Sequence, residues 1–141
     1  MIHKIINLMR KSLGANSGVN SLVAQRIYPS HLSTRVLSGN LKETDFPCIS
    51  IHQQGSDKFN SDNEDGAYYF QINSWSNTEL QICNEVYEAI FTATQHQTFE
   101  DSDVIIEIYE DRELGMLSEK TKAGVRHWHT MRWKVFATFK N

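Results

Sequence analysis

Residues 125–139 carry a long pattern in which apolar and polar side chains alternate. Successive side chains of a β-strand point to opposite faces of a sheet, so this pattern predicts one long strand with a buried and an exposed face. A lone strand cannot cover its apolar face, so it must belong to a sheet packed beneath another layer. The predicted inner face consists of Val125, His127, His129, Met131, Trp133, Val135, Ala137 and Phe139, and the opposite face consists mostly of Arg126, Thr130, Arg132 and Lys134.

Three further segments have the alternation of strands, namely 46–53, 67–75 and 103–110. Apolar residues at helical spacing predict one helix over 2–13 and another from Ser76 to about Gln95. The second helix begins with Ser76-Asn77-Thr78-Glu79, a capping-box pattern with Ser76 at the N-cap and Glu79 reaching back. Polar loops are predicted over 30–45, 55–66 and 111–123.

These elements predict a single α+β domain over residues 1–141. It would contain one mostly antiparallel four-stranded sheet, with the N-terminal helix and the central helix packed on one face. The chain length of 141 residues and its 40% hydrophobic and 22% charged composition fit one globular domain. No stretch approaches the roughly 20 apolar residues of a membrane span, and residues 1–13 lack the continuous apolar region of a signal peptide. We therefore expect a soluble protein, cytoplasmic in the cell that makes it.

Candidate chemistry in the sequence is sparse. His127 and His129 share one strand face and could approach one metal ion, but a zinc site needs three or four ligands and no third ligand stands at a diagnostic spacing. Packing or interface histidines are the preferred interpretation. Residues 61–66 resemble a calcium loop, but the position that needs a bidentate Glu is Ile72. We predict no catalytic residue, no metal and no cofactor, and we expect Cys48 and Cys83 to be buried thiols without a disulfide.

Charge is distributed unevenly along the chain. The net charge of −3 argues against a nucleic-acid-binding protein, which would usually be basic. The C-terminal part is basic, with Arg126, Arg132 and Lys134 as the candidate interface between subunits or between stacked rings. The 55–66 loop is acidic, with Asp57, Asp62, Glu64 and Asp65. A basic and an acidic patch on one chain suit head-to-tail contacts between subunits, which close into rings when the rotation permits.

The order of several short motifs resembles the tail-completion proteins of long-tailed bacteriophages, a group that includes relatives of the phage lambda tail terminator. An amphipathic helix ends near Leu13, a variable loop separates the first two motifs, and a strand ending in Trp75 runs directly into a helix. The motifs are Arg26-Ile27-Tyr28-Pro29, then Phe46-Pro47-Cys48-Ile49-Ser50-Ile51, then Phe70-Gln71-Ile72-Asn73-Ser74-Trp75-Ser76, and finally Arg132-Trp133-Lys134-Val135-Phe136. None of them is catalytic.

The resemblance implies a non-enzymatic virion protein that forms a ring, hexameric in the family, at the head-proximal end of the tail tube. Such a ring stops tube polymerisation and joins the tail to the head connector. Its partners would be other copies of itself, the tail-tube protein and the neck proteins. DNA would pass through its lumen without specific binding, and the acidic 55–66 loop is the candidate lining. A head-completion or neck adaptor is one alternative, and a small binding module or enzyme outside phages that uses His127 and His129 is another.

Overall fold

The structure is a computed structural model, and it describes residues 2–29, 43–59, 64–121 and 124–140. In chain order the elements are α1 (Ile2–Ala15), α2 (Ser17–Val23), β1 (Ile27–Pro29), a short 3-10 helix η1 (Glu43–Asp45), β2 (Cys48–Lys58), β3 (Gly66–Ser76), α4 (Leu80–Thr94), β4 (Gln97–Glu100), β5 (Val104–Thr121) and β6 (Gly124–Phe139). None of the helices in these described ranges is long and apolar enough to cross a membrane.

The strands form one six-stranded, strongly curled sheet in the order β1-β2-β3-β6-β5-β4. β1 runs parallel to β2, and all other neighbours are antiparallel. The prediction of a four-stranded, mostly antiparallel sheet was therefore wrong, although the α+β class holds. The four predicted strands are present as β2, β3, β5 and β6, while β1 and β4 were missed. Both missed strands lie at sheet edges and span too few residues to show a period.

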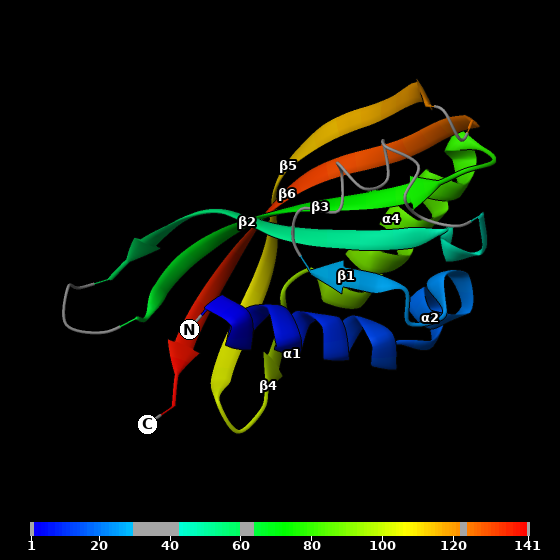
Figure 1. Cartoon of the computed structure of the whole chain (residues 1–141). Coiled ribbons are helices and arrows are strands. Elements are labelled where there is room, and N and C mark those ends of the chain that lie inside the picture. Colours follow the sequence, from blue (N-terminus) through cyan, green and yellow to red (C-terminus); the bar gives the residue numbers. More distant parts are fainter. Residues whose placement is uncertain (1, 30–42, 60–63, 122–123, 141) are drawn as a thin grey trace.

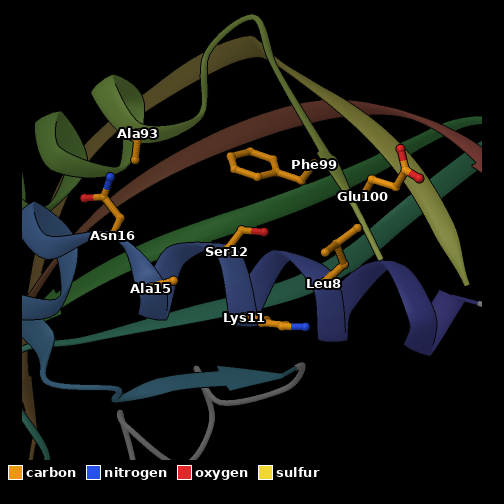
Figure 2. Close-up of a pocket in the computed structure, with 8 residues that line it drawn as sticks. All are labelled: Leu8, Lys11, Ser12, Ala15, Asn16, Ala93, Phe99 and Glu100. Atoms are coloured by element: carbon orange, nitrogen blue, oxygen red, sulfur yellow. The ribbon is translucent and has the colours of Figure 1, made fainter. Parts of the chain in front are cut away.

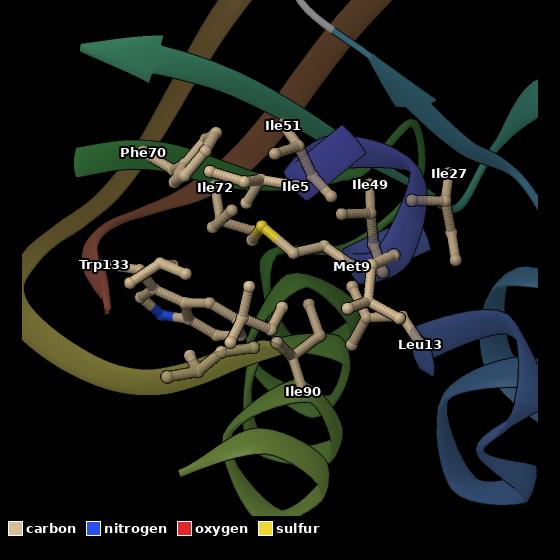
Figure 3. Close-up of a cluster of buried hydrophobic side chains, with 14 of the residues drawn as sticks. Ile5, Met9, Leu13, Ile27, Ile49, Ile51, Phe70, Ile72, Ile90 and Trp133 are labelled. Atoms are coloured by element: carbon tan, nitrogen blue, oxygen red, sulfur yellow. The ribbon is translucent and has the colours of Figure 1, made fainter. Parts of the chain in front are cut away.

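The helices α1, α2 and α4 lie on one side of the sheet, and we call this side the helix face (Figure 1). Their apolar stripes pack on inward-pointing residues of five strands, as Figure 3 shows for part of the core. Ile5, Met9 and Leu13 come from α1, and Ile90 comes from α4. The period of two in β6 is confirmed on this face by the buried Met131, Trp133, Val135 and Ala137. Apolar burial of this extent is the main force that stabilises such a fold.

A second, smaller apolar cluster lies on the opposite side of the sheet, which we call the open face. It joins Phe46, Cys48 and Trp75, with Tyr28 and Trp128 packed against it. The indole Nε1 of Trp75 donates a 2.9 Å hydrogen bond to the buried hydroxyl of Ser50 on β2. The Trp75 indole is thus buried with its polar atom hydrogen-bonded, and the cluster packs one end of the open face.

Four local predictions need correction. The polar loop expected over 111–123 is strand as far as Thr121, and the 55–66 loop is strand up to Lys58 and from Gly66 onward. α4 begins at Leu80 with Glu79 as its N-cap, so Ser76 is not the cap residue. The Ser76 hydroxyl instead accepts hydrogen bonds from the backbone N–H groups of Thr78 and Glu79, in the turn before the helix. Within the predicted loop 30–45, Glu43–Asp45 form η1, and residues 30–42 lie outside the described part of the chain.

Candidate assembly surfaces

The far ends of β5 and β6 form a hairpin near the start of α4, and the last pairs of this hairpin continue past Ser76, where β3 ends (Figure 1). We define the β5–β6 arm as Leu114–Thr121 together with Gly124–Trp128. Most of the exposed large apolar residues within the described ranges lie on it. Leu114, Met116, Leu117 and Val125 have exposed fractions between 42% and 51%. From Arg112 onward, no strand in the described ranges pairs with the outer edge of β5. Sequence reasoning missed this surface because it assigned residues 111–123 to a polar loop and placed Val125, which is exposed, on the inner face of the last strand.

Tyr87 of α4 holds the root of the arm through one hydrogen bond and one ring contact, and a hydrogen-bonded pair joins β5 to β6 beside it. His129 is fully buried, and its Nε2 lies 2.7 Å from a carboxylate oxygen of Glu113 on β5. The ring of Tyr87 on α4 lies over the His129 imidazole at 4.1 Å between centroids, and its hydroxyl donates a 2.8 Å hydrogen bond to Glu110. Burial, followed by the hydrogen bond to Glu110, raises the pKa of Tyr87. The arm therefore projects from a fixed base.

The two histidines singled out in the sequence have different partners. His127 lies nearer the end of the arm, and its Nδ1 is 2.6 Å from the hydroxyl of Ser118. His129 faces Glu113 and Tyr87 instead. Among the described residues no group of three or more His, Cys, Asp or Glu side chains could hold a metal ion. The arrangement suits histidines that fix the hairpin.

The predicted basic patch divides into two parts on the open face. Arg132 and Lys134 flank the ring of Tyr69, with the Arg132 Cζ 4.5 Å and the Lys134 Nζ 5.9 Å from the ring centroid. Arg132 also forms a 3.2 Å ion pair with Asp111. Arg126 is buried instead, and its guanidinium lies 4.8 Å from the ring centroid of Phe46. Only Arg132 and Lys134 are thus brought together where a partner can reach them.

The acidic residues of the predicted 55–66 loop gather at the end of the β2–β3 hairpin. Asp57 is exposed on β2, and Glu64 forms a 2.9 Å ion pair with Lys58. A carboxylate oxygen of Asp65 accepts a 2.8 Å hydrogen bond from the backbone N–H of Phe139, which ties this hairpin to the end of β6. Asp62 lies outside the described residues.

A cleft of about 370 Å³ lies between α1, the end of α4 and β4 (Figure 2). We call it the α1 cleft. Its apolar lining comes from Leu8, Ala15, Ala93 and Phe99, and its polar lining from Lys11, Ser12, Asn16 and Glu100. These residues are distant in sequence, so no local motif could have predicted the cleft.

Cys48 and Cys83 are both buried and neither forms a disulfide, as predicted. Burial raises the pKa of each thiol to about 12. The thiolate is the reactive form of cysteine, so these side chains are inert at neutral pH. They act as small apolar residues in the packing of the two faces.

Comparison with known proteins shows the fold. No protein-family model matches the sequence, and neither does any curated protein sequence. Among solved structures, a chain described as part of the virion of a native gene transfer agent particle superposes with a TM-score of 0.61. The match covers 95% of this chain and 95% of that chain, at 11% sequence identity. The two chains therefore share one fold over nearly their whole lengths.

Proposed function

We propose that the protein is a structural component of the virion of a long-tailed bacteriophage or a phage-like particle. The observation that carries the proposal is the shared fold with a chain of a gene transfer agent virion over 95% of both chains. The order of motifs from Arg26-Ile27-Tyr28-Pro29 to the final strand supports it independently. Fold likeness alone does not fix function, so the surfaces must supply the finer argument.

Within that class, we propose the tail terminator, a homo-oligomeric ring, hexameric by resemblance, at the head-proximal end of the tail tube. A terminator needs one surface for its neighbours in the ring, one for the tube and one for the neck. The chain offers the β5–β6 arm, the α1 cleft, the pair Arg132 and Lys134, and the acidic β2–β3 hairpin as separate surfaces. Surfaces that differ from one another favour heterologous contacts, which generate rings when the rotation closes.

The charges suggest how the ring would be oriented around DNA. Double-stranded DNA carries one negative charge per ~1.7 Å of its axis, so a basic lumen would bind DNA and hinder its passage. We place the acidic β2–β3 hairpin, with Asp57, Glu64 and Asp65, toward the lumen. Arg132 and Lys134 would then contact a neighbouring subunit or another ring of the virion. The burial of Arg126 removes it from this contact surface.

Deletion of the gene tests the proposal, because a terminator and a neck adaptor fail differently. Loss of a terminator should give tail tubes of uncontrolled length, measured by electron microscopy. Loss of a neck adaptor should give tails of normal length beside unjoined heads. Particles of normal form and number after deletion would refute both roles.

Charge reversal then tests the contact surface. We expect Arg132→Glu combined with Lys134→Glu to fail to restore tail length when it replaces the wild-type gene. The matched control is Lys58→Glu, which reverses one exposed charge within the acidic hairpin and should restore normal tails. Normal tails from the Arg132/Lys134 variant would remove these residues from the proposed interface.

A further inference from the structure

We propose that the β5–β6 arm of one copy inserts into the α1 cleft of a second copy. This contact would hold the proposed ring together. Its biological purpose rests on the proposed function, whereas the contact itself does not. The arm and the cleft are different surfaces of the same chain. Each copy would therefore give one contact and receive one, which is the arrangement that a ring requires.

The arm presents apolar side chains that the single chain leaves uncovered. Leu114, Met116 and Leu117 are all close to half exposed and follow one another along β5. Single exposed apolar residues are ordinary in proteins, but a contiguous group of them marks an interaction site. The register pairs Met116 with His129 and Leu117 with Trp128, so these two side chains point to opposite faces of the arm. One of these two side chains can therefore enter a cleft while the other stays outside it.

The α1 cleft has the size and lining to receive such side chains. Its volume of about 370 Å³ compares with the ~150 Å³ of an apolar cavity that accepts a benzene-sized group. The cleft therefore has room for more than one apolar side chain. Leu8 and Phe99 face each other across it from α1 and β4, as Figure 2 shows. Leu8 is only 3% exposed, so Phe99, Ala93 and Ala15 provide most of the apolar surface that Leu117 or Met116 would cover, and covering it would remove apolar surface from water on both partners.

Charge complements the apolar match. Glu119 shares the open face of the arm with Leu117, because residues two apart on a strand point the same way. Lys11 lies one helical turn after Leu8 and lines the cleft. Neither Glu119 nor Lys11 belongs to a salt bridge in the part of the chain that the structure describes, although Glu119 lies opposite Arg126 in the register and the charge of Lys11 helps to lower the pKa of Asp101. An arm seated in the cleft with Leu117 above Leu8 brings this acid and this base together.

The contact cannot form within one molecule. β4 borders the cleft and pairs with Ile105–Ile108 at the start of β5, whereas Leu117 lies toward the other end of that strand. Strand residues advance roughly 3.3 Å each, so the path along β5 from Ile106, the partner of Phe99, to Leu117 is roughly 30 Å. An arm seated in this cleft would therefore come from another copy.

Mixing two variants tests the proposal, with oligomer mass measured by native mass spectrometry. The arm variant is Met116→Glu with Leu117→Glu, and the cleft variant is Ala15→Trp, which fills the cleft from an exposed position. We expect the wild type to form oligomers and each variant alone to be monomeric. An equal mixture should give one-to-one dimers and nothing larger, because one variant keeps an intact cleft and the other an intact arm. The control Phe59→Glu changes an exposed apolar residue away from the arm and should keep the wild-type mass.

A charge swap provides a second measurement that leaves the apolar residues unchanged. Glu119→Lys and Lys11→Glu should each weaken association by about two- to fivefold at low salt, the range of an exposed ion pair. The two substitutions combined in one chain should restore the wild-type dissociation constant. Thermal melts of every variant establish that a lost contact is not a lost fold.

Several outcomes would overturn the proposal. These are a wild type that stays monomeric at every concentration, a mixture that contains only monomers, or variants that still form full rings. The proposed function fails separately, if the protein is absent from purified particles. Heterodimers in the mixture together with absence from virions would keep the arm-and-cleft contact and reject the virion role. Full rings from both variants in normal particles would reject the arm-and-cleft contact and keep the virion role.

Discussion

Replacing Ile90 by Ala tests the packing of α4 on the sheet. Ile90 is fully buried in the main core (Figure 3). The substitution removes three carbon atoms, which at ~0.8 kcal/mol each contribute about 2.4 kcal/mol of transfer free energy. The cavity left behind adds to this loss, and the higher helix propensity of Ala returns at most about 0.5 kcal/mol. We therefore expect the free energy of unfolding to fall by about 3 kcal/mol.

Urea denaturation followed by tryptophan fluorescence measures this loss. With a slope of about 2 kcal/mol per molar urea, the midpoint should fall by about 1.5 M. The matched control is Phe91→Ala at the next position of the same helix. Phe91 is 39% exposed, so this change should cost clearly less than the change at Ile90, despite removing a larger side chain. A loss below about 0.5 kcal/mol for Ile90→Ala, the size of a surface substitution, would refute the packing described here.

Three further predictions concern polar groups. Ser50→Ala should lower the free energy of unfolding by about 1–3 kcal/mol, because it leaves the buried indole N–H of Trp75 without its acceptor. The same substitution should cost less in a Trp75→Phe background, which has no indole N–H to satisfy. The pKa of both thiols, Cys48 and Cys83, is about 12 in the folded chain and lower in the unfolded chain, so only the unfolded chain loses these protons above about pH 9. The free energy of unfolding should therefore fall as pH rises above about 9, by up to ~1.4 kcal/mol per pH unit for each thiol. Replacing both by Ala should flatten that slope in urea titrations. Chelator treatment should leave the melting temperature unchanged, and a loss of stability that zinc restores would contradict this.

The predictable part of the fold comprises the elements with one buried and one exposed side. β6 and α4 show their period in the sequence because Met131, Trp133 and Ile90 repeat on one face only. Residues 111–121 of β5 show no such period, because both faces of the arm are exposed and apolar residues therefore need not alternate with polar ones. β1 and β4 depend on pairing with distant strands, which a local window cannot detect.

The candidate surfaces were less predictable than the fold. Alternation correctly placed Arg126, Arg132 and Lys134 on one face of β6, but it could not show that Phe46 would cover Arg126. That contact joins residues far apart in sequence. The α1 cleft has the same origin, because Leu8 and Phe99 meet only after the sheet and helices have formed. Side-chain direction can be read locally, whereas accessibility depends on the whole chain.

The register shifts in β5 give the strand two places where its length can change over evolution. Asp111 and Leu114 are extra residues, one in each β-bulge, and each reverses which side chains point to the helix face. Two reversals restore the original phase, so Val104 and Met116 lie on the same face of the sheet. Deleting Leu114 would remove the second bulge and leave Met116 opposite His129, Leu117 opposite Trp128, and Ile106 and Ile108 in the core. A one-codon change in length at the bulge could thus be absorbed without altering the interior or the faces of the arm.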